Sequence, residues 1–429
     1  MSSEHGELAV AMPRASWPAS DSRISIRTAT IAWILLGIAV CGKVVVSPER
    51  HSLWPVFRHG ALGWWRGDSN IYLDPLLHFR YSPVFAALLA PFVALPWLFG
   101  NLLFDLGGLA LLFYSIRQLT RVVFPEGLFS RDEPAVLLLS LIGVVRCVWS
   151  SQAHTWSAAL IFLAAVALVE RRWWAAAFLL ALAVHLKLAP VVLAGVVAMN
   201  WPRTMSWRLP AAFGSWAMLP LVRGGPAHAA EMYRDWFERL QNYSTRRWPS
   251  FRDVLHVFEI SHINLTPTSY RGLQACVGLG VLFWTWRLAR RCGDIRWVVS
   301  GSFALTITYM LLFGPTVEFV QYPLLAPWVS GALLAAWPQP GRRLALGLVF
   351  VLTMICGFGA IEDAIGSLTH SQASEALITL GTLGFGAWII LLWRTNCLHG
   401  APLPVAAGAT RVVSSENAVG EPQREKAGP

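Results

Sequence analysis

Positively charged side chains interrupt apolar stretches of this 429-residue chain at two places. Lys187 stands at the turn between two short apolar segments, and Arg146 lies near the end of another. A lysine removed from water needs an anion beside it to keep its charge, and phosphate is such an anion. Arginine binds phosphate through paired hydrogen bonds. The alternatives are a lysine that extends to the surface and an arginine that is paired within the protein.

Two long loops, at about 47–82 and 224–272, are rich in Trp, Arg and His. The second loop carries a series of basic side chains: Arg234, Arg239, Arg246, Arg247, Arg252 and Arg271. A basic loop beside a membrane suits a phosphate or an anionic lipid head group. The alternative is that these arginines extend to the membrane interface next to anchoring tryptophans.

An acidic side chain, Asp105, lies inside an apolar run. A charge in such a place is costly, so it must be paired or functional. We expect Asp105 to form a hydrogen bond or an ion pair between segments. A transporter would need further polar residues through the middle of the bilayer. The other polar groups in apolar runs lie toward one side, which favours a one-sided enzyme site.

Composition shows which solvent surrounds these residues. Hydrophobic residues make up 55% of the chain and charged residues 14%, against roughly 25% charged in soluble domains. Too few polar side chains are present to cover a surface in water, so lipid must cover much of it. The net charge of +10 comes from short basic clusters between apolar runs. That pattern is typical of membrane topology and not of nucleic-acid binding.

The sequence predicts an all-α, polytopic integral membrane protein with about 10–13 transmembrane helices. Apolar segments lie at about 28–46, 98–116, 135–149, 156–170, 173–186, 188–200, 209–223, 273–289, 297–313, 319–337, 343–360 and 375–393. The stretch Ser82–Pro96 is apolar but interrupted by Pro91, which predicts a half-span or an interfacial helix.

Arginines occupy alternate turns between these segments, which places those turns in the cytoplasm and the two long loops outside. We expect three parts: a cytoplasmic tail at 1–27, a transmembrane domain at 28–393, and a disordered cytoplasmic tail at 394–429.

Motifs of soluble enzymes are absent from the sequence. It contains no P-loop, no dinucleotide fingerprint, no His-Glu-x-x-His, no nucleophile elbow and no Asp-x-Asp. The six cysteines are scattered, without Cys-x-x-Cys or a His/Cys cluster. We therefore expect neither a metal ion nor a cofactor.

Four motifs follow one another along the chain. They are Trp65–Asp68 with Phe79–Pro91; Ser151–His154 with Glu170–Arg172 and Lys187–Pro190; Gln241–Arg252; and Gly314–Pro327. In order and spacing, this set resembles bacterial glycosyltransferase family 87, with Ser-Gln-x-His in place of the family's Gly-Gln-x-Asn. The family consists of multispanning GT-C-type enzymes, among them mannosyltransferases that use polyprenyl-phosphate sugars.

The resemblance implies transfer of a hexose from a polyprenyl-phosphate donor to a lipid or glycan acceptor. The reaction would take place on the extracytoplasmic side of the bacterial cytoplasmic membrane. The resemblance also implies that the donor phosphate is bound by Arg146, Lys187, Arg246 and Arg247. The implied substrate-binding residues are Tyr81, Gln152, His154, Asn242 and Glu318.

The catalytic base is where the chain departs from the family. An Asp-Phe pair is expected just after the first span, but Arg50–Trp54 contains no acid. The candidates are Asp68, then Asp74, then His51; the alternative role for Asp68 is in a turn, because Gly67–Asn70 has turn composition. Two other interpretations therefore remain: a transporter or flippase of a lipid-linked sugar, and an inactive member of the fold.

Overall fold

A computed structural model of the chain describes residues 24–72, 79–242, 267–314, 319–356 and 373–397. These residues form helices joined by turns and contain no strand, so the all-α prediction is confirmed for them. Helices are expected for such an apolar sequence. Lipid cannot form hydrogen bonds with the backbone, whereas a helix satisfies its own backbone N–H and C=O groups.

Each of the twelve apolar segments contains a helix. These helices are α1 (Ile26–Val46), α5 (Trp97–Gln118), α6 (Glu133–Trp149), α7 (His154–Val169), α8 (Trp173–Leu186), α9 (Val191–Asn200), α11 (Arg208–Ala217), α14 (Pro267–Arg291), α15 (Ile295–Phe313), α16 (Ala326–Ala336), α17 (Pro340–Phe350) and α19 (Ala373–Cys397). Among the described residues, three helices are long and apolar enough to cross a bilayer: Ile26–Val46, Trp97–Val123 and Ile295–Phe313. The chain is a multi-pass integral membrane protein.

The remaining helical elements join or extend these helices, and many of them begin at or contain a proline. They are α2 (Trp54–Arg66), η1 (Ser69–Tyr72), α3 (Pro83–Leu88), α4 (Ala90–Val93), η2 (Leu119–Val123), α10 (Pro202–Met205), η3 (Leu219–Val222), α12 (Gly225–Asn242), η4 (Phe319–Leu324) and η5 (Val351–Ile355). The stretch Ser82–Pro96 is broken into α3 and α4, each with a proline in its first turn. Proline lacks the N–H that would continue a preceding helix, which explains the break.

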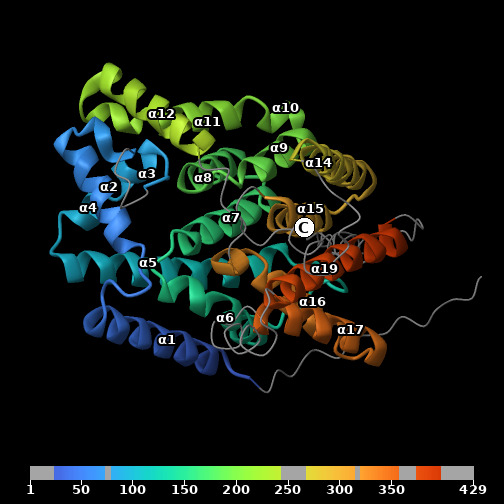
Figure 1. Cartoon of the computed structure of the whole chain (residues 1–429). Helices are drawn as coiled ribbons and strands as arrows, with labels where there is room; N and C mark the ends of the chain where they lie inside the picture. Colours follow the sequence, from blue (N-terminus) through green and yellow to red (C-terminus); the bar gives the residue numbers. More distant parts are fainter. Residues whose placement is uncertain (1–23, 73–78, 243–266, 315–318, 357–372, 398–429) are drawn as a thin grey trace, which may run out of the picture.

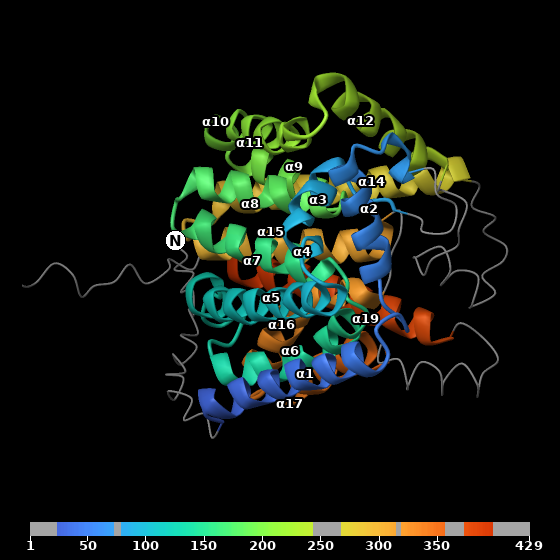
Figure 2. The ribbon, with the colours of Figure 1, turned by 90° about the vertical axis from the view of Figure 1, so that its left-hand side faces the viewer.

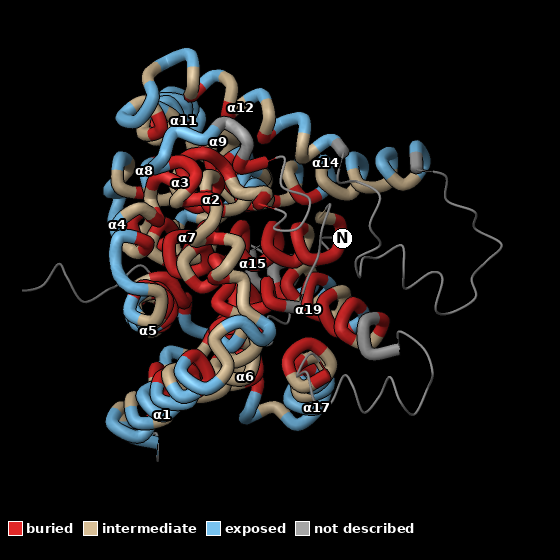
Figure 3. Tube along the Cα trace, turned by 60° about the vertical axis from the view of Figure 1, so that its left-hand side comes forward, coloured by how far each residue is buried: buried red, intermediate tan, exposed pale blue. Residues whose placement is uncertain are grey.

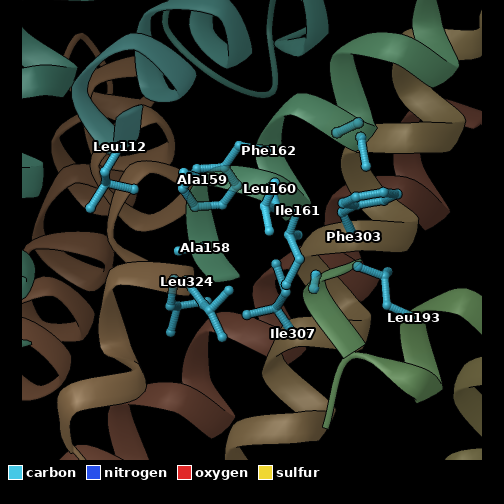
Figure 4. Packing of buried hydrophobic residues seen from close by; sticks show 14 of the residues in the cluster. Leu112, Ala158, Ala159, Leu160, Ile161, Phe162, Leu193, Phe303, Ile307 and Leu324 are labelled. Carbon is cyan, nitrogen blue, oxygen red and sulfur yellow. The ribbon is translucent and has the colours of Figure 1, made fainter. Parts of the chain in front are cut away.

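The centre of the bundle is α7, of which 13 of the 16 residues are buried. It packs against α5, α8, α15 and η4. In Figure 4, Ala158, Ala159 and Phe162 of α7 lie among Leu112, Phe303 and Leu324 from three of these elements. The small alanines let neighbouring helices approach closely, as in other membrane bundles.

The rim of the bundle shows the opposite pattern. In Figures 1 and 2, α1 lies along one edge and α10, α11 and α12 along the opposite edge, with α7 and α15 between them. Figure 3 shows exposed residues along α1 and α12 and buried ones along α7. Ile31, Ile34 and Ile38 of α1 are between 56% and 61% exposed, which suits contact with lipid.

Successive helices alternate in direction, so the bundle has two ends. We call one the arginine end: it comprises the turns at 117–132, 170–172, 201–207, 292–294 and 337–342. We call the other the first-loop end: it comprises residues 47–96 and the turns at 150–153 and 187–190.

The arginine end is held by an ion cluster. The carboxylate of Glu133 in α6 accepts hydrogen bonds from the Nε atoms of Arg117 and Arg121. The Glu133 side chain is 10% exposed, whereas Arg121 is 52% exposed. A carboxylate in that position needs its cations, because the site offers little water to replace them.

Replacing Glu133 by Gln should therefore lower the free energy of unfolding by about 1–2 kcal/mol, since both arginines are partly solvated. Glu126→Gln is the matched control, because Glu126 pairs with Arg131 but is 79% exposed. Thermal unfolding of the purified protein in detergent measures both. Equal shifts for the two variants would contradict this account of Glu133.

Candidate functional site

Helix α2 is joined to the first-loop end of the bundle at its beginning. The Leu53 N–H donates to the Ser150 carbonyl at 3.1 Å, and the Ser52 hydroxyl donates to Ser151 Oγ at 3.1 Å. Trp54 is fully buried next to Phe104 of α5, with ring centroids 5.7 Å apart. The helix then runs for 13 residues and ends at Gly67, whose φ of 82° suits glycine.

The chain returns along α2 and brings Tyr81 toward the bundle. A Cβ at Gly60 would lie 2.4 Å from the Phe79 ring, so only glycine permits this approach. The Tyr72 hydroxyl donates to the Tyr81 carbonyl at 3.0 Å. The Tyr81 ring then packs edge-on against Phe57, with centroids 4.9 Å apart. An aromatic cluster therefore fixes the position of Tyr81.

Two further bonds hold the segment around Tyr81 in place. The Trp236 indole of α12 donates to the Arg80 carbonyl at 2.9 Å. The Ser82 hydroxyl donates to the His185 carbonyl at the end of α8, at 2.5 Å. Helix α12 and the end of α8 thus approach Tyr81 from two sides.

Polar side chains gather beside Tyr81, and we call them the His154 cluster: Tyr81, Gln152, His154 and Lys187. Lys187 Nζ lies 5.9 Å from the centroid of the Tyr81 ring and interacts electrostatically with His154. Gln152 and His154 are 8% and 2% exposed, respectively. Neither Gln152 Oε1 nor His154 Nε2 has a hydrogen-bond partner within the described part of the chain. Buried polar atoms of this kind are costly unless something binds them, which marks the cluster as a candidate substrate site.

Local folding explains why these four residues meet. His154 begins α7 and Gln152 lies in the tight turn that ends α6. Lys187 follows the last residue of α8 in an extended conformation, with Pro190 and α9 after it. Each residue therefore occupies a helix end at the same end of the bundle, where a polar side chain can be buried without interrupting a helix.

A second group of polar side chains lies behind the cluster. Ser151 Oγ donates to Asp105 Oδ2 at 2.9 Å and lies 3.4 Å from Asn101 Oδ1. Lys43 of α1 is buried and interacts electrostatically with Asp105. The expectation that Asp105 forms a bond between segments agrees with this geometry.

The other predicted residues lie in several places. His51 is exposed and directly precedes Ser52. Asp68 is also exposed, but it follows the opposite end of α2, about 20 Å along the helix from Ser52. Arg146 is half-buried in the last turn of α6. Asn242 is the last residue of α12, and its side chain lies outside the described residues, as do Asp74, Arg246, Arg247 and Glu318.

Sequence reasoning missed Lys43, Asn101, Ser151 and Asp235 as residues near the site. Lys43 is the one charged residue of α1 beyond its first turn, and that signal was available in the sequence. Asp235 of α12 interacts electrostatically with Tyr72. Nothing in the amphipathic pattern of α12 distinguishes Asp235 from its exposed acidic neighbours. Among the described residues, no three His, Cys, Asp or Glu side chains gather closely enough to hold a metal ion.

Comparison with known families identifies the family of the chain. The sequence model of glycosyltransferase family 87 matches residues 79–315, more than half of the chain. The chain belongs to glycosyltransferase family 87. It is accordingly a membrane glycosyltransferase, and the matched region contains all four residues of the His154 cluster. No curated protein matches the sequence.

The bond from Tyr72 to the Tyr81 carbonyl yields a prediction. Tyr72→Phe removes one buried hydrogen bond and should lower the free energy of unfolding by about 1 kcal/mol. Burial raises the pKa of Tyr72 well above its ordinary 10.0, so its hydroxyl stays protonated in the folded protein. The difference between wild type and variant should therefore be constant below about pH 10 and shrink above it, because the unfolded chain then loses the Tyr72 proton while the folded protein still keeps it.

Tyr233→Phe provides the control for this variant. The Tyr233 hydroxyl donates to the Ala217 carbonyl at 3.0 Å, outside the His154 cluster. Both variants should lose similar stability, but only Tyr72→Phe should alter sugar transfer. Equal transfer by the two variants, at equal stability, would contradict a role of Tyr72 in positioning Tyr81.

Proposed function

We propose that this enzyme transfers a hexose from a polyprenyl-phosphate donor to a hydroxyl of a lipid or glycan acceptor at the first-loop end. The proposal depends on one observation: Gln152 Oε1 and His154 Nε2 are buried without hydrogen-bond partners next to the charged Lys187. A hydroxyl-rich sugar attached to a phosphate would satisfy both kinds of group.

Lys187 and Arg146 are proposed to bind the donor phosphate. Both lie at helix ends on the first-loop side, and both are partly buried. Charge builds up on the phosphate as its bond to the anomeric carbon breaks, and cations held in position stabilise it. Arg246 and Arg247 are proposed to contribute further positive charge, because they follow α12, which contacts Arg80.

Gln152 and His154 are proposed to bind hydroxyl groups of the sugar, and Tyr81 to pack against its ring. Gln152 Oε1 accepts hydrogen bonds, and a neutral imidazole nitrogen either donates or accepts one, so the pair suits groups that do both. Asn242 and Glu318 remain proposed substrate-binding residues on the strength of the motifs alone.

The general base must lie within hydrogen-bond reach of the acceptor hydroxyl. His51, Asp68 and Asp74 are the proposed candidates from the first loop. Of these, His51 has the strongest support, because its neighbour Ser52 is bonded to Ser151, beside Gln152. Asp68 lies at the far end of α2, about 20 Å away.

The distribution of arginine supports an extracytoplasmic site. The turns at the arginine end are short and basic, as cytoplasmic turns are under the positive-inside rule. We propose that residues 28–393 form the transmembrane domain, with cytoplasmic tails at 1–27 and 394–429, in a bacterial cytoplasmic membrane.

A transporter or flippase of a lipid-linked sugar is the competing proposal, together with an inactive member of the family. Transport would require polar groups along a path through the bundle. The groups of the His154 cluster that lack partners within the described residues lie at the first-loop end, and most side chains in the core around α7 are apolar. This arrangement favours the enzyme.

The Lys187 side chain gives a direct test of the proposed function. Lys187→Met should lower kcat/KM for a labelled polyprenyl-phosphate hexose by about 100-fold, and Lys187→Arg should restore part of it. Arg58→Met is the control, because Arg58 Nη1 donates to the Val93 and Leu95 carbonyls and serves the backbone. Wild-type protein that transfers no sugar from any donor in a broad panel to lipid or glycan acceptors would overturn the proposal.

The choice of base is tested by a matched pair of variants. If His51 is the base, His51→Gln should reduce kcat by about 100-fold or more, whereas Asp68→Asn should change it little. Full activity in His51→Gln together with an inactive Asp68→Asn would assign the base to Asp68 instead.

A further inference from the structure

The turn between α6 and α7 contains a residue in an unusual backbone conformation. Ser151 has a φ of 48°, in the left-handed region that side chains other than glycine rarely adopt. Its N–H donates to the Val148 carbonyl at 3.0 Å, and the Gln152 N–H donates to the Cys147 carbonyl at 3.2 Å. This pair of bonds is the Schellman motif that ends many helices, in which glycine is the usual residue. A serine in this conformation is strained, so its hydroxyl is expected to contribute something that glycine cannot.

The hydroxyl of Ser151 joins three separate parts of the chain. It accepts a hydrogen bond from the Ser52 hydroxyl at 3.1 Å and donates one to Asp105 Oδ2 at 2.9 Å. Asn101 Oδ1 of α5 lies 3.4 Å away. A hydroxyl has one proton and two lone pairs, so it can donate to Asp105 while accepting from Ser52. Ser151 itself is 1% exposed, so water contributes little to these bonds.

We propose that Ser151 is a positioning residue. Its hydroxyl holds Gln152 and His154 in a fixed position relative to α5 and to the start of the first loop. The two residues follow Ser151 directly, and neither has a side-chain bond of its own at Oε1 or Nε2 within the described part of the chain. Their orientation therefore depends on the turn that carries them. Ser52, whose hydroxyl donates to Ser151, directly follows His51 in the chain. This inference rests on the proposed function.

Asp105 serves as the fixed end of this connection. It lies two turns into α5, is 4% exposed, and has Lys43 of α1 as its electrostatic partner. Its position inside a packed helix limits how far this carboxylate can move. The bond from Ser151 to Asp105 therefore fixes the α6–α7 turn to a helix of the bundle.

The substitution Ser151→Gly removes the hydroxyl but allows the same backbone conformation. Glycine adopts a φ of 48° without strain, which offsets part of the loss of the two hydroxyl bonds, so the variant should still fold, with an unfolding temperature only slightly below that of wild type. Loss of the hydroxyl should nevertheless reduce kcat by about tenfold, with a smaller change in KM, because the reacting groups are less well aligned. A residue that only shapes the turn would give full activity with glycine.

Arg171→Gly is the matched control. Arg171 has a φ of 58° and occupies the same kind of turn after α7, at the arginine end. It should keep or gain stability, because it relieves the same backbone strain at an exposed residue, and it should leave sugar transfer unchanged. Ser52→Ala is the second test of the bond, since it removes the donor without altering the turn, and it should produce a smaller loss of kcat than Ser151→Gly.

Hydrogen–deuterium exchange makes the result independent of catalysis. Ser151→Gly should speed amide exchange in residues 52–57 and 150–156, whereas Arg171→Gly should not. Faster exchange in these segments with an inactive wild type would uphold the connection and reject the proposed function. Unchanged exchange, or activity of Ser151→Gly within twofold of wild type, would overturn the role of Ser151.

Discussion

The cost of leaving a polar group unsatisfied in an apolar environment governs this protein. Within the bundle that cost limits the polar side chains of α7 and its neighbours mainly to serine and threonine, and most of the core is alanine, leucine, isoleucine, valine and phenylalanine. Most charged residues of the bundle lie near helix ends, where they reach water, another charge or a substrate, and the buried Asp105 of α5 is an exception that is bonded to Ser151. The proposed site lies at an end of the bundle, because binding of a sugar phosphate would require charged and polar groups that are costly in the apolar middle.

The two ends meet this constraint in different ways. At the arginine end, Glu133 is matched by Arg117 and Arg121, and the result is a closed set of bonds. At the first-loop end, Asp105 is matched by Ser151 and Lys43, but Gln152 Oε1 and His154 Nε2 are left without partners in the described structure. Satisfied polar groups stabilise a fold, and unsatisfied ones beside a cation are suited to bind a ligand. Within the described residues, buried polar atoms without partners also occur at the arginine end, for example Asn200 Oδ1, so the neighbouring cation Lys187 is what distinguishes Gln152 and His154.

Much of the fold follows from the sequence, because apolar length and proline position act locally. The segment 98–116 became α5, and the prolines of Ser82–Pro96 broke that stretch as expected. The proximity of Tyr81, His154 and Lys187 was implied by motif order, since each follows or precedes a helix that ends on the same side. Lys43 and Ser151 were not foreseen as part of the site, because their importance comes from contacts between α1, α5 and the α6–α7 turn. Such contacts depend on how helices rotate about their axes, which periodicity does not determine in helices that are apolar all round.

The family match does not cover most of the first loop. The family match begins at Phe79, after α1 and α2, so the loop that carries His51 and Asp68 lies outside it. The structure explains how such a loop can vary. Its start is held by a backbone bond from Leu53 to Ser150 and by the buried ring of Trp54, and neither requires a particular residue at position 51. A base can therefore be supplied from different positions on a loop whose attachment stays the same, while the His154 cluster, built from helix ends, has no such freedom.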